Sequence, residues 1–233
     1  MKFKKYIASA ACAASAIMFT ALLPVNAETS NTEQKSHVYS IASCSKTFAA
    51  TAAMQLADAG KLEIDAPVAE YVPEFTMADE RYKDITVRML MNHTSGMFGT
   101  VYGNDMLLDD RKDFDEKAFL DTLSTQYLKA DPGEYGCYCN DGYTLLTIVV
   151  ERVSGEPFAD YLTKHICQPL GLTQTGTHYD MFRSPDQQEI FISGGKRFVP
   201  EYDISLGSGG ILSTASDLCK FGSSFFKGNS NSS

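Results

Sequence analysis

The stretch that most constrains the fold runs from residue 39 to residue 60, because its second half carries a clear helical repeat. Small and apolar residues recur there at helical spacing, namely Phe48, Ala49, Ala52, Ala53, Leu56 and Ala59. Gly60 follows as a helix stop signal. The pattern predicts a helix from Lys46 onward. It places Ser43 at the first turn, with Lys46 one turn further along the same face.

Ser43 and Lys46 have the spacing of a nucleophile and its base. The free N–H groups and the positive dipole end of a helix favour negative charge that develops near a serine at its start. An amine on the same face can take the hydroxyl proton when burial lowers the pKa of that amine. The same residues also fit an ordinary helix start, since serine is a common N-cap and Ser-x-x-Lys recurs by chance. The motif alone leaves both interpretations open.

The composition and the first residues predict one packed domain behind an export signal. The chain has 233 residues, of which 44% are hydrophobic, so a buried core is feasible. Residues 1–27 combine a basic start, an apolar run and a small-residue cleavage site at Ala27, which is typical of a signal peptide. A single membrane anchor is the alternative. We expect a secreted or cell-envelope protein with a polar linker over residues 28–38, a domain over residues 39–227 and a disordered tail over residues 228–233.

Charge and cysteine content limit the partners. The formal net charge is −9, and removal of a signal segment with three lysines makes it more negative, so nucleic acid is an unfavourable partner. The cysteines beyond that segment are odd in number, which leaves at least one free or paired between chains. They are Cys44, Cys137, Cys139, Cys167 and Cys219. A Cys44–Cys139 disulfide is one hypothesis. Neither the cysteines nor the four scattered histidines have the spacing of a metal site.

The remaining patterns predict a mostly helical chain. Helices are expected over residues 68–72, 87–92, 115–129, 143–153, 158–166 and 216–226. Short strand pieces are expected near residues 190–193 and 197–200, and residues 207–210 are expected to form a flexible loop. These elements cannot build a large sheet.

A second informative segment is Tyr138-Cys-Asn140, which we expect on a loop just before the apolar helix of residues 143–153. A phenol at Tyr138 could act as a general base, and the amide of Asn140 could fix Lys46 and a substrate carbonyl. The alternative is a tyrosine packed in a turn and an asparagine that caps the helix.

Five motifs follow one another at sensible spacing. They are Tyr39-Ser-Ile-Ala-Ser43-Cys-Ser-Lys46, Gly60-Lys-Leu-Glu-Ile-Asp-Ala-Pro67, Ile85-Thr-Val-Arg-Met-Leu-Met-Asn-His93-Thr-Ser-Gly96, Tyr138-Cys-Asn140 and Gly209-Gly-Ile-Leu-Ser-Thr214. Together they resemble the serine β-lactamase and penicillin-binding-protein-like family, in its class C β-lactamase and D-Ala-D-Ala carboxypeptidase branch. The resemblance runs from about Tyr39 to Phe226 and implies the helical subdomain of that α+β fold, mainly α with a remnant of sheet.

The resemblance also implies roles. Ser43 would be the acylated nucleophile, and Lys46 and Tyr138 would share its proton. Asn140 would orient Lys46 and bind the substrate amide, while the Ser43 N–H would form half of an oxyanion hole. No metal or organic cofactor is implied. The substrates would be β-lactams, peptidoglycan stem peptides or small esters and amides. His93 would be a structural member of its turn, so we expect it outside the site.

The chain also departs from the family pattern. The family domain is longer, and it carries sheet strands before the nucleophile helix. A later strand with Lys-Thr-Gly or His-x-Gly has no counterpart in this sequence. We therefore expect a chain truncated at both ends. Two alternatives follow: a serine hydrolase that works through an acyl-enzyme, and a catalytically inactive homologue with at most a binding role.

Overall fold

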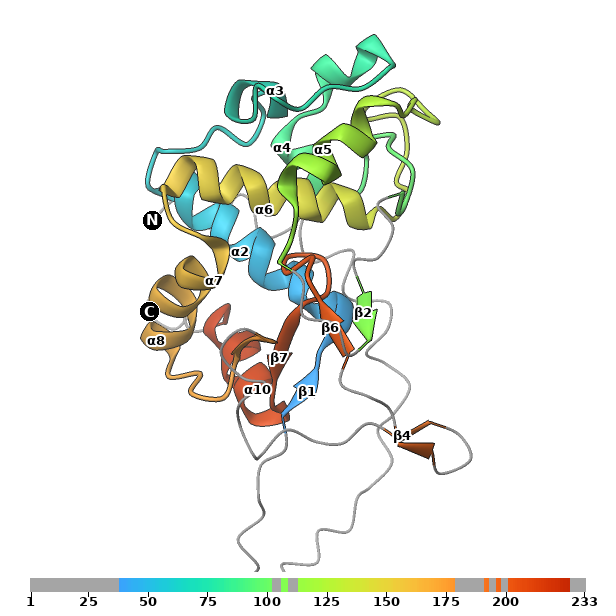
Figure 1. Ribbon diagram of the computed structural model, residues 1–233. Coiled ribbons are helices and arrows are strands. Elements are labelled where there is room, and N and C mark those ends of the chain that lie inside the picture. The colour runs from blue at the N-terminus through green and yellow to red at the C-terminus, as the bar shows by residue number, and fades with distance from the viewer. Residues whose placement is uncertain are drawn as a thin grey trace, which may run out of the picture.

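Figure 1 shows a computed structural model of the protein, which describes residues 38–101, 106–108, 113–178, 191–192, 196–197 and 201–226. Two long helices, α2 (Ser45–Asp58) and α6 (Asn140–Ser154), pack against each other at its centre. The expected signal peptide, most of the linker and the expected tail lie outside the described residues. Within the described part of the chain, no helix is long and apolar enough to cross a membrane.

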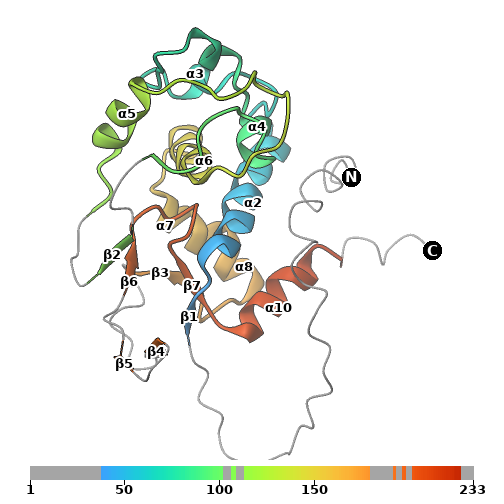
Figure 2. The same ribbon diagram turned by 90° about the vertical axis from the view of Figure 1, so that its right-hand side faces the viewer.

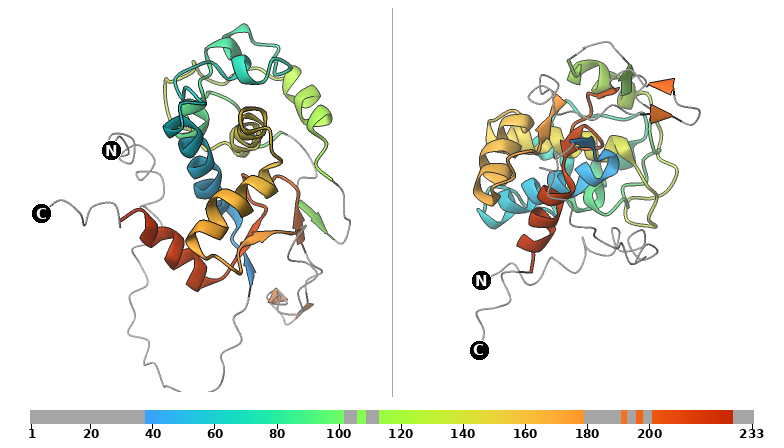
Figure 3. Two further views of the ribbon diagram at one scale, coloured as in Figure 1. Left: turned by 90° about the vertical axis from the view of Figure 1, so that its left-hand side faces the viewer. Right: turned by 90° about the horizontal axis from the view of Figure 1, so that it is seen from below.

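Shorter helices surround these two. They are α3 (Val68–Tyr71), α4 (Val87–Met91), α5 (Glu116–Ser124), α7 (Phe158–Tyr161), α8 (Gln168–Leu170) and α10 (Ala215–Ser224), with the 3-10 turns η2 (Ala42–Cys44) and η3 (Glu80–Asp84) and the π-helical turn η4 (Leu162–Cys167). Figure 2 and the left view of Figure 3 look nearly along the axis of α6, and the labels in Figure 2 show α2, α3, α4 and α5 arranged around it.

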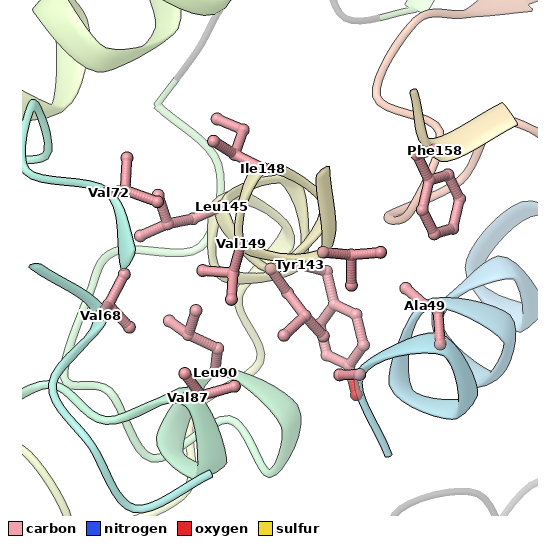
Figure 4. Packing of buried hydrophobic residues seen from close by; sticks show 14 of the residues in the cluster. Ala49, Val68, Val72, Val87, Leu90, Tyr143, Leu145, Ile148, Val149 and Phe158 are labelled. Carbon is pink, nitrogen blue, oxygen red and sulfur yellow. The ribbon is translucent and has the colours of Figure 1, made fainter. Parts of the chain in front are cut away.

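The core lies between α6 and its neighbours, and Figure 4 shows its packing. Leu145 and Val149 of α6 point towards the α3 and α4 side, where Val68 and Leu90 meet them. On the other side lies α2, whose Ala49, Ala52 and Ala53 are fully buried. Because alanine side chains are short, the two helix axes can approach closely, and this fixes the start of α2 relative to the start of α6.

A small antiparallel sheet lies beneath the start of α2. Its order is β1–β7–β3, formed by β1 (Tyr39–Ser40), β7 (Ile211–Ser213) and β3 (Gly176–Thr177). Tyr39 pairs with Ser213, and Thr177 pairs with Ile211. Two further two-stranded antiparallel sheets join β2 (Met106–Leu108) to β6 (Glu201–Asp203) and β4 (Phe191–Ile192) to β5 (Lys196–Arg197).

The predicted fold class is confirmed, since the described chain is mainly helical with a small sheet. The helix expected over residues 115–129 is shorter, because α5 ends at Ser124. After Ser124 the backbone makes hydrogen bonds to a distant segment instead. Gln126 O accepts from the Ala78 amide at 3.0 Å, and the Leu128 amide donates to Asp79 Oδ2 at 3.1 Å. These bonds replace the helical ones that the amphipathic pattern predicts.

The flexible loop expected over residues 207–210 is also wrong, because these residues form a tight buried turn. The amides of Ser208 and Gly209 both donate to Ser205 O, at 2.9 and 3.1 Å. A Cβ on Gly207 would lie 2.0 Å from Thr147 Oγ1, and one on Gly210 would lie 2.4 Å from Asp203 O. The glycines therefore serve close packing of the turn against α6 and β6 rather than mobility.

Candidate active site

Ser43 is held by the sheet that leads into α2. The Ile41 amide donates to Ile211 O of β7 at 3.0 Å, and Ser45 Oγ accepts from the Ile211 amide at 3.1 Å. Between these anchors Ala42 adopts φ +44, a left-handed conformation that is uncommon for a residue with a side chain. The sharp turn leaves Ser43 exposed in η2, just before α2 begins. The strand and the helix thus present one hydroxyl to solvent.

Lys46 lies beneath that hydroxyl and is 5% exposed. Its Nζ donates to Ser208 O at 2.6 Å, to Asn140 Oδ1 at 2.7 Å and to Ser43 Oγ at 3.3 Å. An ammonium group has three N–H donors, so each has an acceptor. The nitrogen also lies 4.8 Å from the Tyr138 ring centroid and 5.5 Å from that of Tyr143. These contacts fix the cation in one position.

Tyr138 approaches Ser43 from the opposite side. Its hydroxyl donates to Ser43 Oγ at 2.6 Å, although the two residues are 95 positions apart in the chain. The residue is 51% exposed. Ser43 Oγ is therefore within hydrogen-bond reach of both a phenol and an amine, which is the geometry that activates a hydroxyl nucleophile.

Asn140 is the first residue of α6, not a loop residue as expected. Its Oδ1 accepts from Lys46 and its Nδ2 donates to Thr100 Oγ1 at 2.9 Å, so both ends of the amide have partners. Cys139 is the N-cap of the helix, and its Sγ accepts from the Gly142 amide at 3.2 Å. The structure brings Ser43, Lys46, Tyr138 and Asn140 together.

The disulfide hypothesis for Cys44 and Cys139 is wrong, because both are free thiols. Cys44 is exposed, whereas Cys139 is buried, caps α6 and contacts Phe98 O at 2.9 Å. Burial raises the pKa of the Cys139 thiol to about 12. The sulfur therefore bonds the start of α6 through Gly142 and the distant Phe98 carbonyl, rather than a second cysteine.

Two groups of the site differ from the sequence analysis, because one was not predicted and the other was expected to lie outside the site. The carbonyl of Ser208 is one, and a backbone acceptor leaves no residue signature. The other is His93, whose Nδ1 accepts from the Cys139 amide at 3.1 Å and whose ring centroid lies 4.5 Å from that of Tyr138. Burial, and secondarily the charge of Lys46, lower the pKa of His93 to about 4. Its place in His93-Thr-Ser-Gly96 was the available signal.

A serine within reach of an amine and a phenol, at the junction of a strand and a helix, defines an acyl-transfer type of site. Among the described residues, no cluster of three or more histidine, cysteine or acidic side chains could hold a metal ion. Comparison with known proteins then identifies the family. The Beta-lactamase family profile matches residues 20–232, and the chain belongs to this family.

Individual relatives agree with this assignment. The chain is 29% identical to the putative penicillin-binding protein PbpX of Bacillus subtilis, over 81% of this chain and 46% of the relative. It is 33% identical to esterase EstB of Burkholderia gladioli, over 60% of this chain and 38% of the relative. D-amino acid amidase from Ochrobactrum anthropi superposes with a TM-score of 0.71 at 25% identity, over 83% of this chain and 58% of that structure. The chain spans about half the length of the curated relatives it matches.

Proposed function

We propose that the protein is a serine hydrolase that works through an acyl-enzyme on Ser43. The observation that carries this proposal is the convergence on Ser43 Oγ of Tyr138 Oη at 2.6 Å and Lys46 Nζ at 3.3 Å. Serine becomes a useful nucleophile only when a neighbouring group takes its proton. Membership of the Beta-lactamase family supports the same chemistry.

The proposed reaction has two halves. In this proposal the Tyr138–Lys46 pair first releases one proton, which leaves a phenolate beside the Lys46 ammonium. Ser43 Oγ then attacks the substrate carbonyl while its proton passes to the Tyr138 oxygen, the nearer of the two groups. The tetrahedral intermediate collapses, the bond to the leaving amine or alcohol breaks, and the leaving group takes that proton. Water then attacks the acyl-enzyme and gives its proton to the same pair, so that the acid product leaves and Ser43 is restored.

Asn140 and Ser208 have supporting roles in this proposal. Their oxygens hold the Lys46 ammonium at 2.7 and 2.6 Å, which keeps a positive charge beside the developing negative charge. The amide N–H of Ser43 would stabilise the oxyanion. No step requires a metal or an organic cofactor.

The proposed substrates are small acyl compounds: β-lactams, peptidoglycan stem peptides, and small esters or amides. Relatives named as a penicillin-binding protein, an esterase and an amidase support this range. Ser43 and Tyr138 are both exposed, so a carbonyl can reach them without rearrangement of the core. We also propose that the protein works in the cell envelope or outside the cell, after export through residues 1–27.

Covalent labelling with a fluorescent penicillin, read by intact-protein mass spectrometry, tests the proposal. The expected result is one acyl adduct on the parent and none on Ser43→Ala. Cys44→Ala is the matched control, because Cys44 is an exposed nucleophile next to Ser43 and should not carry the label. Failure of the folded parent to label or to hydrolyse p-nitrophenyl esters would instead support an inactive homologue with at most a binding role.

A further inference from the structure

His93 lies directly behind the Tyr138 loop. It follows α4 with φ +62, so the backbone turns sharply there. The His93 carbonyl accepts from the Cys137 amide at 2.7 Å, and its ring Nδ1 accepts from the Cys139 amide at 3.1 Å. The ring centroid lies 4.5 Å from that of Tyr138, with the planes tilted by 34°. One residue therefore binds the backbone on both sides of Tyr138 and contacts its ring.

This arrangement has a particular value because Tyr138 is half exposed. A side chain in that position has lost little freedom by burial, so its hydroxyl stays near Ser43 only if the backbone and ring are held from behind. We infer that His93 is the positioning residue of Tyr138, and that it acts through the Nδ1 acceptor and the ring contact. This inference rests on the proposed function, since it assigns a role within the same site.

The protonation state of His93 is part of the mechanism. Nδ1 can accept from the Cys139 amide only in a neutral imidazole that carries its proton on Nε2. Three titratable groups lie near the ring, namely the Lys46 ammonium and the Tyr138 and Tyr143 phenols. Among these the nearby cation opposes a second positive charge, and burial acts in the same direction. The neutral acceptor form therefore persists across the ordinary working pH range.

Tyr143 is a second aromatic neighbour of the His93 ring. Its ring centroid lies 5.1 Å from that of His93, and its hydroxyl donates to Met91 O at 2.6 Å. His93 thus contacts both a tyrosine of α6 and the tyrosine at the candidate nucleophile. A purely structural role would need only the volume of the ring. A positioning role needs the acceptor nitrogen as well.

The test compares the parent with His93→Gly, since glycine adopts a left-handed φ without strain and has no side-chain acceptor. Amide hydrogen exchange by NMR is the readout that does not depend on activity. We expect exchange at Cys139 to become much faster in the variant, because its acceptor is lost. Exchange at Cys137 should stay slow, because its acceptor is the retained backbone carbonyl. Equal protection of Cys139 in both proteins, or loss at both amides together, would overturn the inference.

The kinetic arm uses a double-mutant cycle with Tyr138→Phe. We expect His93→Gly alone to slow acylation of Ser43 about a hundredfold, as expected for a misplaced catalytic group. In the Tyr138→Phe background the His93 substitution should leave the acylation rate almost unchanged, because the residue that His93 positions no longer has its hydroxyl. Additive losses would contradict a role through Tyr138. If the parent is not acylated at all, the proposed function fails, while the exchange measurement still decides the anchoring.

Discussion

The candidate site has a buried half and an exposed half, and they are built differently. Lys46 is 5% exposed and has three acceptors, one a turn away at Ser43 and two from the distant Asn140 and Ser208. Tyr138 is 51% exposed, and its hydroxyl meets a single oxygen. The cation is therefore fixed by the core itself, whereas the phenol depends on contacts behind its loop. We therefore expect substitutions in the two halves to have different effects on the acylation rate and on the free energy of unfolding.

The largest expected effect is that of Lys46→Met, which removes the cation while keeping an unbranched side chain. We expect acylation to fall roughly 10³- to 10⁴-fold, in the upper range for loss of a proton-transfer group. The Ser208 carbonyl also loses this buried donor, at a cost of about 1–3 kcal/mol in the free energy of unfolding. Stopped-flow acylation and urea unfolding measure the two effects. Unchanged stability would contradict the coupling of this half to the core.

Tyr138→Phe should affect the rate without affecting the fold. We expect a loss of about a hundredfold in acylation, because the hydroxyl beside Ser43 Oγ is gone. The free energy of unfolding should change by less than about 0.5 kcal/mol, as is usual for an exposed position. The same two assays apply. A strongly destabilised variant would show that the exposed half is also part of the core.

Two glycine substitutions test the difference between the halves through the free energy of unfolding alone. Gly207→Ala places a Cβ 2.0 Å from Thr147 Oγ1 and 3.2 Å from Ala49 Cβ, so the turn behind Lys46 must shift. We expect a loss of about 1–3 kcal/mol from overpacking. Gly136→Ala is the matched control in the Tyr138 loop, where no atom lies within 4 Å of the new Cβ. It should be neutral or stabilise slightly, by about 0.4–1 kcal/mol. If thermal or urea unfolding showed equal losses of stability in Gly207→Ala and Gly136→Ala, the distinction between the buried and exposed halves would be contradicted.

The sequence predicted the parts of the site that are local or carried by side chains. Helical spacing placed Ser43 and Lys46 one turn apart, and motif order brought in Tyr138 and Asn140. The Ser208 carbonyl could not be predicted, because its partner lies 162 residues away and a carbonyl belongs to every residue. The anchoring contacts of His93 escaped for a similar reason, since they depend on how the loop after α4 meets the loop before α6. The glycines at 207–210 suggested mobility because sequence alone does not show the atoms that would touch a Cβ.

The pairing of β1 with β7 has a consequence for the order of events during synthesis. Tyr39 and Ser40 emerge early from the ribosome, yet their partners Ser213 and Leu212 are among the last described residues to be made. Contacts of such long sequence separation form slowly, after local helices. A nascent chain therefore carries Ser43 and Lys46 without the turn that aligns them until residues 205–210 have been made. The candidate site is complete only after β7 has paired with β1.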